Sequence, residues 1–389
     1  MGFGDLYTSN RYAKDTPELS YNEIIEIMSE MLNKGEITEE LFTQYKNDLL
    51  GAPISIEDEI AERAWNYVKR TRSQLKQLSM DELVWHKKCE RAHLLLFKDK
   101  IKHVKARKVI HPFKLVALNG YHAWQNIHVK VLGKVPKTKR PIIFAVSHIG
   151  MYDVEIVLQA IKKHAYIFSG DEEAMYRTFD GGFFDANGCY YVDPDDPVDS
   201  AIAPQNLVQY SKNGIYYLWY PEGTWNLTEA YVIMPMHAKI IDVADNVNGI
   251  ILPVGVDQRD KENGIDFIVN IGEVFDPKEM YTGSLTKEKK IELAEELRSD
   301  MARLKYDIYE PMSRADIDDG YYQRFLDKRI AEWPFYNLDI IRSRMFNPNH
   351  NIYEKDVFAH LNEIEIGSNN AFLARTRKQF NDYHKRDLL

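Results

Sequence analysis

The sequence of 389 residues has only two cysteines, Cys89 and Cys189, and they form no CxxC pair. A disulfide scaffold and a cysteine-built zinc site are therefore excluded, and so few cysteines are typical of a reducing compartment. The GxSxG, Walker A, GxGxxG and HExxH patterns are also missing. Their absence argues against a serine hydrolase of the nucleophile-elbow type, a P-loop enzyme, a dinucleotide-binding fold and a zincin.

Long apolar runs are missing as well. A membrane-spanning helix needs about 20 mostly apolar residues, whereas the longest runs, Pro141–Val146 and Gly249–Val256, have the length of strands. The N-terminus carries Asp5 and no apolar stretch behind it, which predicts that there is no secretory signal. We expect a cytoplasmic protein, either free or peripheral on the inner face of the membrane.

Charge is unevenly distributed along the chain. The net charge is −9, yet residues 87–140 hold fifteen Lys or Arg against two acids, Glu90 and Asp99. Apolar residues are interleaved with these cations, as in a helix that lies on anionic lipid headgroups. A solvated basic helix face is an equally open interpretation. A nucleic-acid surface is disfavoured because no nucleic-acid motif accompanies the charge.

The pattern of apolar residues predicts an α/β fold with a mostly parallel central sheet flanked by helices. Residues 1–110 are expected to be a helical region, with capping boxes at Ser20-x-x-Glu23 and Ser79-x-x-Glu82. Short apolar runs that alternate with helical stretches then indicate a buried parallel sheet. These runs are VKVLG, PIIFAVS, HAYIFSG, GCYYVD, IYYLWYP, GIILPVGV and FIVNIG. Residues 111–306 form the predicted α/β domain, which ends in a charged helix over 286–309, and residues 307–389 form a predicted helical extension.

A histidine and an aspartate follow the PIIFAVS run, at His148 and Asp153. Five steps along one helix would turn the second side chain by about 140° from the first, so a continuous helix would not pair them. A strand-to-helix turn would. The carboxylate then orients the imidazole, which has a suitable pKa for a general base.

The run that begins at Gly214 leads directly into Pro221-Glu222-Gly223-Thr224. This turn is expected at the edge of the sheet where sites in α/β proteins form. Gly223 permits a close backbone approach, so that amides there can face a developing oxyanion. In isolation, the same residues are more typical of a simple turn.

Together these two elements resemble the signature of the lysophospholipid and glycerol-3-phosphate acyltransferase superfamily, whose HxxxxD block is followed some seventy residues later by PEGT. Further blocks follow the family order: the resemblance spans about residues 111–306 and includes Val131–Pro136, Gly188–Asp193, Ile251–Val254 and Ile271–Glu273.

The resemblance implies transfer of a fatty acyl chain from acyl-CoA or acyl carrier protein to a hydroxyl of a glycerolipid or other lipid or sugar acceptor. It implies His148 as general base and Asp153 as its support. It also implies that the 221–224 turn, with Glu222, Gly223 and Thr224, holds the acceptor and the oxyanion. Asp193 and Trp225 are further candidates for substrate binding. No metal or cofactor is implied besides the thioester substrate. The expected partners are the acyl donor, the acceptor and, through residues 87–140, an anionic membrane surface, with no nucleic acid. The alternative is a non-catalytic relative that binds lipid or acyl carrier at the membrane surface.

The sequence departs from the family pattern at two positions. Arginines that would hold an acceptor phosphate are replaced by Pro194 and Trp225, which cannot donate as a guanidinium does. Four acids between Asp193 and Asp199 are expected to repel a phosphate. These departures favour an acceptor without phosphate, and Trp225 would suit the face of a sugar ring.

Overall fold

The computed structural model divides into two compact units. One comprises Met1–Lys100 and Pro194–Asn206, and the other Ile101–Asp193 and Leu207–Leu389. Helix α11, Pro197–Lys212, begins in the first unit and ends in the second. The structure describes residues 21–50, 55–98, 101, 103–150, 152–170, 183–184, 186–193, 196–223, 225–226, 233–234, 236–261, 263–312 and 327.

The first unit is helical. Its elements are α2 (Tyr21–Asn33), α3 (Glu39–Leu50), α4 (Ile56–Trp65), α5 (Arg72–Leu75) and α6 (Met80–Phe97), together with the first turns of α11. Helix α6 begins at a capping box in which the Ser79 side chain accepts from the Glu82 amide while the Glu82 carboxylate accepts from the Ser79 amide. This confirms the motif at Ser79. The one expected at Ser20 lies outside the described residues.

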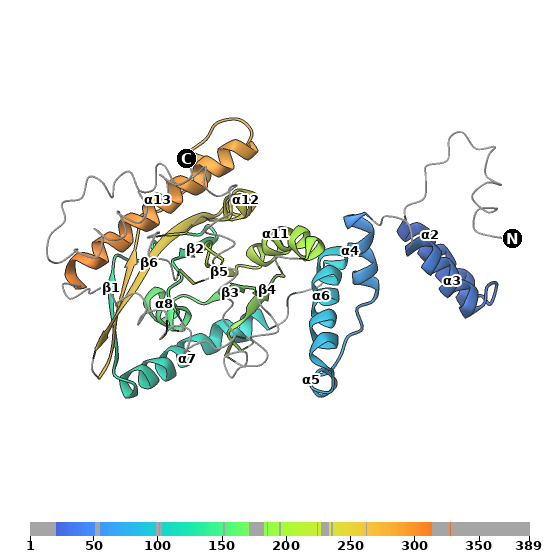
Figure 1. Cartoon of the computed structure of the whole chain (residues 1–389), viewed down its shortest axis with the longest axis horizontal. Helices are drawn as coiled ribbons and strands as arrows, with labels where there is room; N and C mark the ends of the chain where they lie inside the picture. Colours follow the sequence, from blue (N-terminus) through green and yellow to red (C-terminus); the bar gives the residue numbers. More distant parts are fainter. Residues whose placement is uncertain are drawn as a thin grey trace. The chain divides into compact units, whose positions relative to one another are not determined.

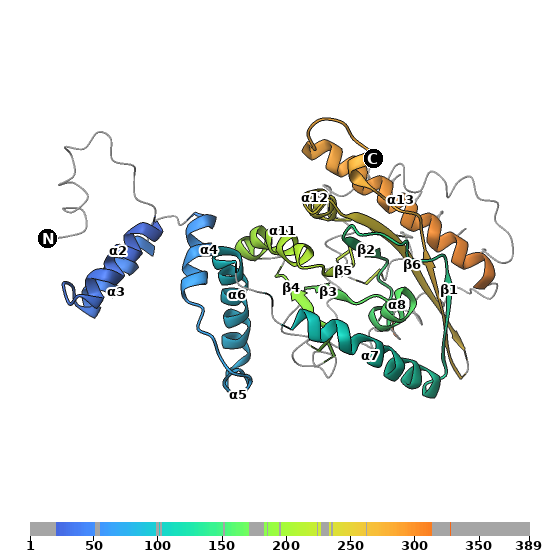
Figure 2. The same cartoon turned by 180° about the vertical axis from the view of Figure 1, so that it is seen from behind.

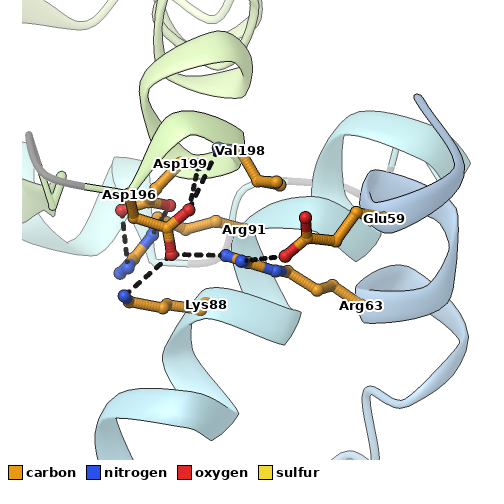
Figure 3. A network of polar contacts seen from close by, with 7 residues as sticks. All are labelled: Glu59, Arg63, Lys88, Arg91, Asp196, Val198 and Asp199. Atoms are coloured by element: carbon orange, nitrogen blue, oxygen red, sulfur yellow. Dashed lines mark hydrogen bonds and ion pairs between the residues drawn. The ribbon is translucent and has the colours of Figure 1, made fainter. Parts of the chain in front are cut away.

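Ion pairs join α4 and α6 to the start of α11 (Figure 3). Asp196 accepts from Arg63 at 2.7 Å and from Lys88 at 2.8 Å, and Asp199 accepts from both Nε and Nη2 of Arg91 at 2.8 and 2.9 Å. Burial alone would raise the pKa of Asp196, but the hydrogen bonds from Arg63 and Lys88 outweigh it and lower that pKa. The acids after residue 193 therefore serve in part to attach this segment to α4 and α6.

The second unit is built on a seven-stranded sheet in the order β1-β7-β6-β2-β5-β3-β4. All neighbouring strands run parallel except the β6–β7 hairpin. The inner strand β2 is buried along its whole length, as expected for a sheet covered on both faces. The strands are β1 (Ile127–Leu132), β2 (Ile142–Val146), β3 (Ala165–Ser169), β4 (Cys189–Tyr191), β5 (Tyr216–Trp219), β6 (Ile250–Lys261) and β7 (Gly264–Ile271).

Helices cover the two faces of this sheet (Figures 1 and 2). α7 (Val104–Trp124) and α8 (Asp153–Ile161) lie on one side, and α12 (Lys239–Asn246) and α13 (Lys287–Met312) on the other; a 3-10 turn spans Pro277–Glu279. The connection through α8 leads from β2 past β5 to β3, whereas the connection through α12 leads from β5 past β2 to β6. The two connections thus move across the sheet in opposite directions, and the order of the strands changes between β2 and β5. Ligands of such sheets bind at the carboxyl ends of the strands on either side of this point.

The predicted fold class is confirmed, because each of the seven apolar runs overlaps one strand of a mostly parallel sheet. The charged helix expected over 286–309 is α13. Apart from residue 327, the chain beyond residue 312 lies outside the described residues.

The basic run of residues 87–140 does not form one helix. It is divided between α6 in the first unit and α7 in the second, with left-handed backbone at Lys98 and His103 between them. Several of its cations have internal partners: Arg91 pairs with Asp199, Lys114 with the Ala186 carbonyl, and Arg140 with Asp276. None of the helices in the described part of the chain combines the length and apolar character needed to span a bilayer.

Replacing Arg91 tests the contribution of the buried pairs in the first unit. We expect Arg91→Ala to lower the free energy of unfolding by about 3 kcal/mol or more, because it leaves the carboxylate of Asp199 buried without its guanidinium. The matched control on the same helix is Lys87→Ala, whose pair with Glu90 is partly exposed and is worth about 0–1 kcal/mol. Denaturant unfolding followed by circular dichroism measures both, and equal losses would contradict this account.

Candidate active site

The carboxyl ends of β2 and β5 bring together two segments that are distant in sequence. The two strands are parallel neighbours, with Ala145 opposite Trp219. The residues that follow them, 147–153 after β2 and 220–226 after β5, therefore leave the sheet at the same edge. These are the two segments that hold the HxxxxD and PEGT residues.

His148 and Asp153 form a hydrogen-bonded pair at this edge. The His148 Nδ1 atom lies 2.7 Å from Asp153 Oδ2. His148 lies two residues after the end of β2, and Asp153 is the first residue of α8. The turn between strand and helix closes the distance that a continuous helix would have left open.

Asp153 is held by more than the imidazole. Its Oδ2 atom also accepts from the backbone amides of Ile149 at 2.9 Å and Gly150 at 3.2 Å. The side chain has no exposed surface, and its negative charge lies at the N-terminus of α8, where the helix dipole favours an anion. The carboxylate therefore joins the turn, the helix start and the imidazole in one arrangement.

This arrangement determines which nitrogen of His148 can act. A carboxylate only accepts, so Nδ1 carries the proton and the lone pair of the neutral ring is on Nε2. The side chain retains 19% of its accessible surface. No residue that the structure describes forms a hydrogen bond with Nε2. His148 is therefore oriented to accept a proton from a group that approaches from solvent.

Glu222 supports His148 from the second segment. Its side chain is fully buried, Oε1 accepts from the His148 amide at 3.0 Å, and Oε2 accepts from the Met234 amide at 2.8 Å. Burial raises the pKa of Glu222, and the two backbone donors and the nearby Lys305 partly oppose that increase. Both oxygens of the Glu222 carboxylate accept from backbone amides, so this side chain stabilises the positions of the His148 and Met234 backbone.

Residues after Glu222 make further backbone contacts with both segments of the site. The Asn226 amide donates to the His148 carbonyl at 2.8 Å, and the His237 amide donates to the Pro221 carbonyl at 3.1 Å. Arg298, a fully buried residue of α13, donates through Nε to the Ile233 carbonyl at 2.9 Å. These contacts hold both ends of the loop.

Two aromatic residues surround the imidazole. The ring of Tyr220 is stacked on that of His148, with centroids 4.1 Å apart and planes at 28°. The ring of Trp225 meets it edge to face at 6.0 Å and 83°. Both residues are buried. Trp225, at the position of a phosphate-holding arginine in the family pattern, thus forms an apolar wall beside His148.

The other predicted site residues are placed differently. The Gly223 backbone is left-handed at φ +74°, and its amide donates to the Tyr220 carbonyl at 2.9 Å, so that amide already has an acceptor. Thr224 lies outside the described residues. Asp193 follows β4 at the edge of the sheet, and β5 and β3 lie between β4 and β2.

The expectation that the acids of 193–199 act as free negative charge needs correction for two of the four, Asp196 and Asp199. Asp196 and Asp199 are paired with Arg63, Lys88 and Arg91 in the first unit. Their charge is neutralised locally, so they do not give a reason for repulsion of a phosphate.

Four contributing residues had not been identified from the sequence. Ser147 Oγ accepts from the Val256 amide at 2.8 Å and so links the end of β2 to β6. Tyr220 precedes the PEGT motif within an aromatic run, and nothing in the sequence distinguishes it from the neighbouring aromatic residues. Met234 and Arg298 are distant in sequence and carry no local signal. Within the described ranges, no three His, Cys, Asp or Glu side chains are grouped so as to hold a metal ion.

Comparisons with known proteins match part of this chain. Residues 126–257 match the family model described as Acyltransferase. Comparison with curated proteins returned no match. Among solved structures, the chain is similar to that of the 1-acyl-sn-glycerophosphate (LPA) acyltransferase PlsC from Thermotoga maritima. The identity is 18%, the coverage is 56% of this chain and 88% of that chain, and the TM-score is 0.41.

Replacing Asp153 by Ala tests its control of the imidazole. The imidazole and the amides of Ile149 and Gly150 all contact Oδ2, so an Asn oxygen in that place would still accept from Nδ1–H, whereas Ala leaves no acceptor there. We expect Asp153→Ala to lower the share of the Nδ1–H tautomer of His148, as measured by 15N NMR with the signal assigned through His148→Ala. Glu155→Gln, two residues further along α8, is the control and should leave the tautomer unchanged. An unaltered tautomer in Asp153→Ala would contradict the assignment.

Proposed function

Because residues 126–257 form a domain of the acyltransferase superfamily, we propose that this protein is an O-acyltransferase with a His148–Asp153 general base. The donor is a fatty acyl thioester of CoA or of an acyl carrier protein. The acceptor is a hydroxyl of a glycerolipid or of another lipid or sugar. The observation that carries the proposal is the 2.7 Å contact that directs the Nε2 lone pair of His148 toward solvent.

The proposed reaction proceeds by direct attack. Nε2 of His148 takes the proton of the acceptor hydroxyl while the oxygen attacks the thioester carbonyl. The tetrahedral intermediate collapses, the C–S bond breaks, and the imidazolium returns the proton to the leaving thiolate. Asp153 stabilises the imidazolium through Nδ1–H. The products are an ester and a free thiol, and the enzyme ends unchanged.

For the acceptor, we propose a hydroxyl compound whose recognition does not require an arginine grip on phosphate. The support is Trp225, which is buried beside the imidazole where the family pattern has an arginine. The charge of Asp196 and Asp199 no longer supports this choice, since both are paired. A phosphorylated acceptor is the alternative that the assay must include.

Loss of the general base should slow transfer strongly. We expect His148→Ala to lower the rate of acceptor-dependent thiol release by about 10³-fold, since general base catalysis contributes about 10²–10⁴. His128→Ala, a change at an exposed histidine on β1, is the control and should retain the wild-type rate. Acyl-CoA and acyl carrier protein are each supplied with phosphorylated and plain acceptors, and products are identified by mass spectrometry. A wild-type rate no higher than that of His148→Ala for every pair would favour the non-catalytic binding protein.

We also propose that helix α7 docks on an anionic membrane surface. The helix has four cations, Lys105, Arg107, Lys108 and Lys114, and no acid. One stripe at helical spacing is apolar and exposed, with Phe113 at 72% and Trp124 at 78%; Val109 and Val116 complete it. Such a helix binds by burying apolar side chains at the headgroup boundary, with electrostatic support from basic residues.

Vesicle binding tests this surface. We expect the protein to sediment with vesicles that contain anionic lipid, less so at high salt, and Phe113→Ser combined with Trp124→Ser to weaken binding about tenfold or more. Trp65→Ser, which removes an exposed tryptophan from α4, is the control. Equal sedimentation with neutral and anionic vesicles would contradict the proposal.

A further inference from the structure

Of the two aromatic rings from the second segment that contact the imidazole of His148, that of Tyr220 is the nearer. Tyr220 follows β5 directly, is buried, and stacks on the imidazole with ring centroids 4.1 Å apart. A ring at this distance restricts rotation of the imidazole about its own axis. It also presents its face to a group that becomes cationic when it accepts a proton.

The hydroxyl of Tyr220 and the second oxygen of Asp153 are both unsatisfied. Tyr220 OH and Asp153 Oδ1 are buried, and neither has a hydrogen-bond partner among the described residues. The other oxygen, Oδ2, already receives three donors. Burial raises the pKa of Tyr220 well above its usual range, and the Asp153 carboxylate adds to the increase. The hydroxyl therefore stays protonated, which makes it a donor beside a carboxylate.

A buried carboxylate oxygen without a donor is costly, and native structures rarely leave one. The Tyr220 hydroxyl is a buried donor without an acceptor among the described residues, and Asp153 lies close enough to Tyr220 to raise its pKa. The two unsatisfied groups therefore complement each other.

We propose that Tyr220 is a positioning residue of the dyad, with its ring holding the imidazole of His148 and its hydroxyl donating to Asp153 Oδ1. The kinetic consequence rests on the proposed function. Donation to Oδ1 fixes the second oxygen of the carboxylate and withdraws part of its charge from the Nδ1–H bond. Ring and hydroxyl thus act on His148 in opposite senses, since the ring favours the imidazolium and the hydroxyl moderates the support that Asp153 gives it.

Two variants separate these contributions. Tyr220→Phe keeps the ring and removes the hydroxyl, and Tyr220→Leu removes both. The control is Tyr217→Phe, which removes another buried hydroxyl of β5, one that donates to the Leu207 carbonyl at 2.8 Å. We expect Tyr220→Phe to lower kcat about tenfold and to move the acidic limb of the pH–rate profile upward by about half a pH unit. In Tyr220→Leu the limb should lie below that of Tyr220→Phe, because the aromatic face is lost. Tyr217→Phe should shift neither.

An NMR measurement keeps this test independent of activity. The Nδ1–H proton signal of His148, assigned through His148→Ala, should move downfield in Tyr220→Phe, because Asp153 becomes a stronger acceptor, and should stay in place in Tyr217→Phe. If that signal moves in a protein that transfers no acyl group to any acceptor, the positioning role stands and the proposed function fails. If transfer is observed and neither the signal nor the acidic limb moves in Tyr220→Phe, the positioning role is overturned.

Discussion

One carboxylate oxygen holds the candidate active site together. Oδ2 of Asp153 accepts from the imidazole of His148 and from the amides of Ile149 and Gly150. The hydrogen bonds from these two amides satisfy backbone donors that would otherwise have no partner in the buried turn between strand and helix. The third bond uses the same oxygen to orient the imidazole. The local fold and the chemistry of the site therefore depend on one atom, so a substitution there alters both.

The second constraint comes from the parallel pairing of β2 with β5. It places Glu222 next to His148 although 74 residues separate them. Asp153 determines the ring orientation of His148, while Glu222 and Asn226 hold its backbone through the amide and the carbonyl. His148 is thus held both by the segment after β2, to which it belongs, and by the segment after β5. A general base needs such fixed geometry more than it needs an unusual acidity.

Much of the fold was predictable because its determinants are local. Each strand overlaps a short apolar run, and the pairing of His148 with Asp153 follows from a strand end and a helix start. The order of the strands was not predictable, because β5 lies between β2 and β3, which are consecutive in the chain. The burial of the Glu222 side chain was not predictable either, since an acid in a turn usually faces water.

The basic and acidic segments show where counting charge along a sequence fails. Residues 87–140 have a large positive excess, but the fold divides them between two units and pairs Arg91 and Arg140 with internal carboxylates. Asp196 and Asp199 are likewise neutralised by cations from α4 and α6. A charge that is paired within the protein contributes little to the field that a partner meets. Helix α7 is therefore distinguished by having exposed apolar side chains and no acidic residue. The exposure of these side chains is evident only from the folded structure.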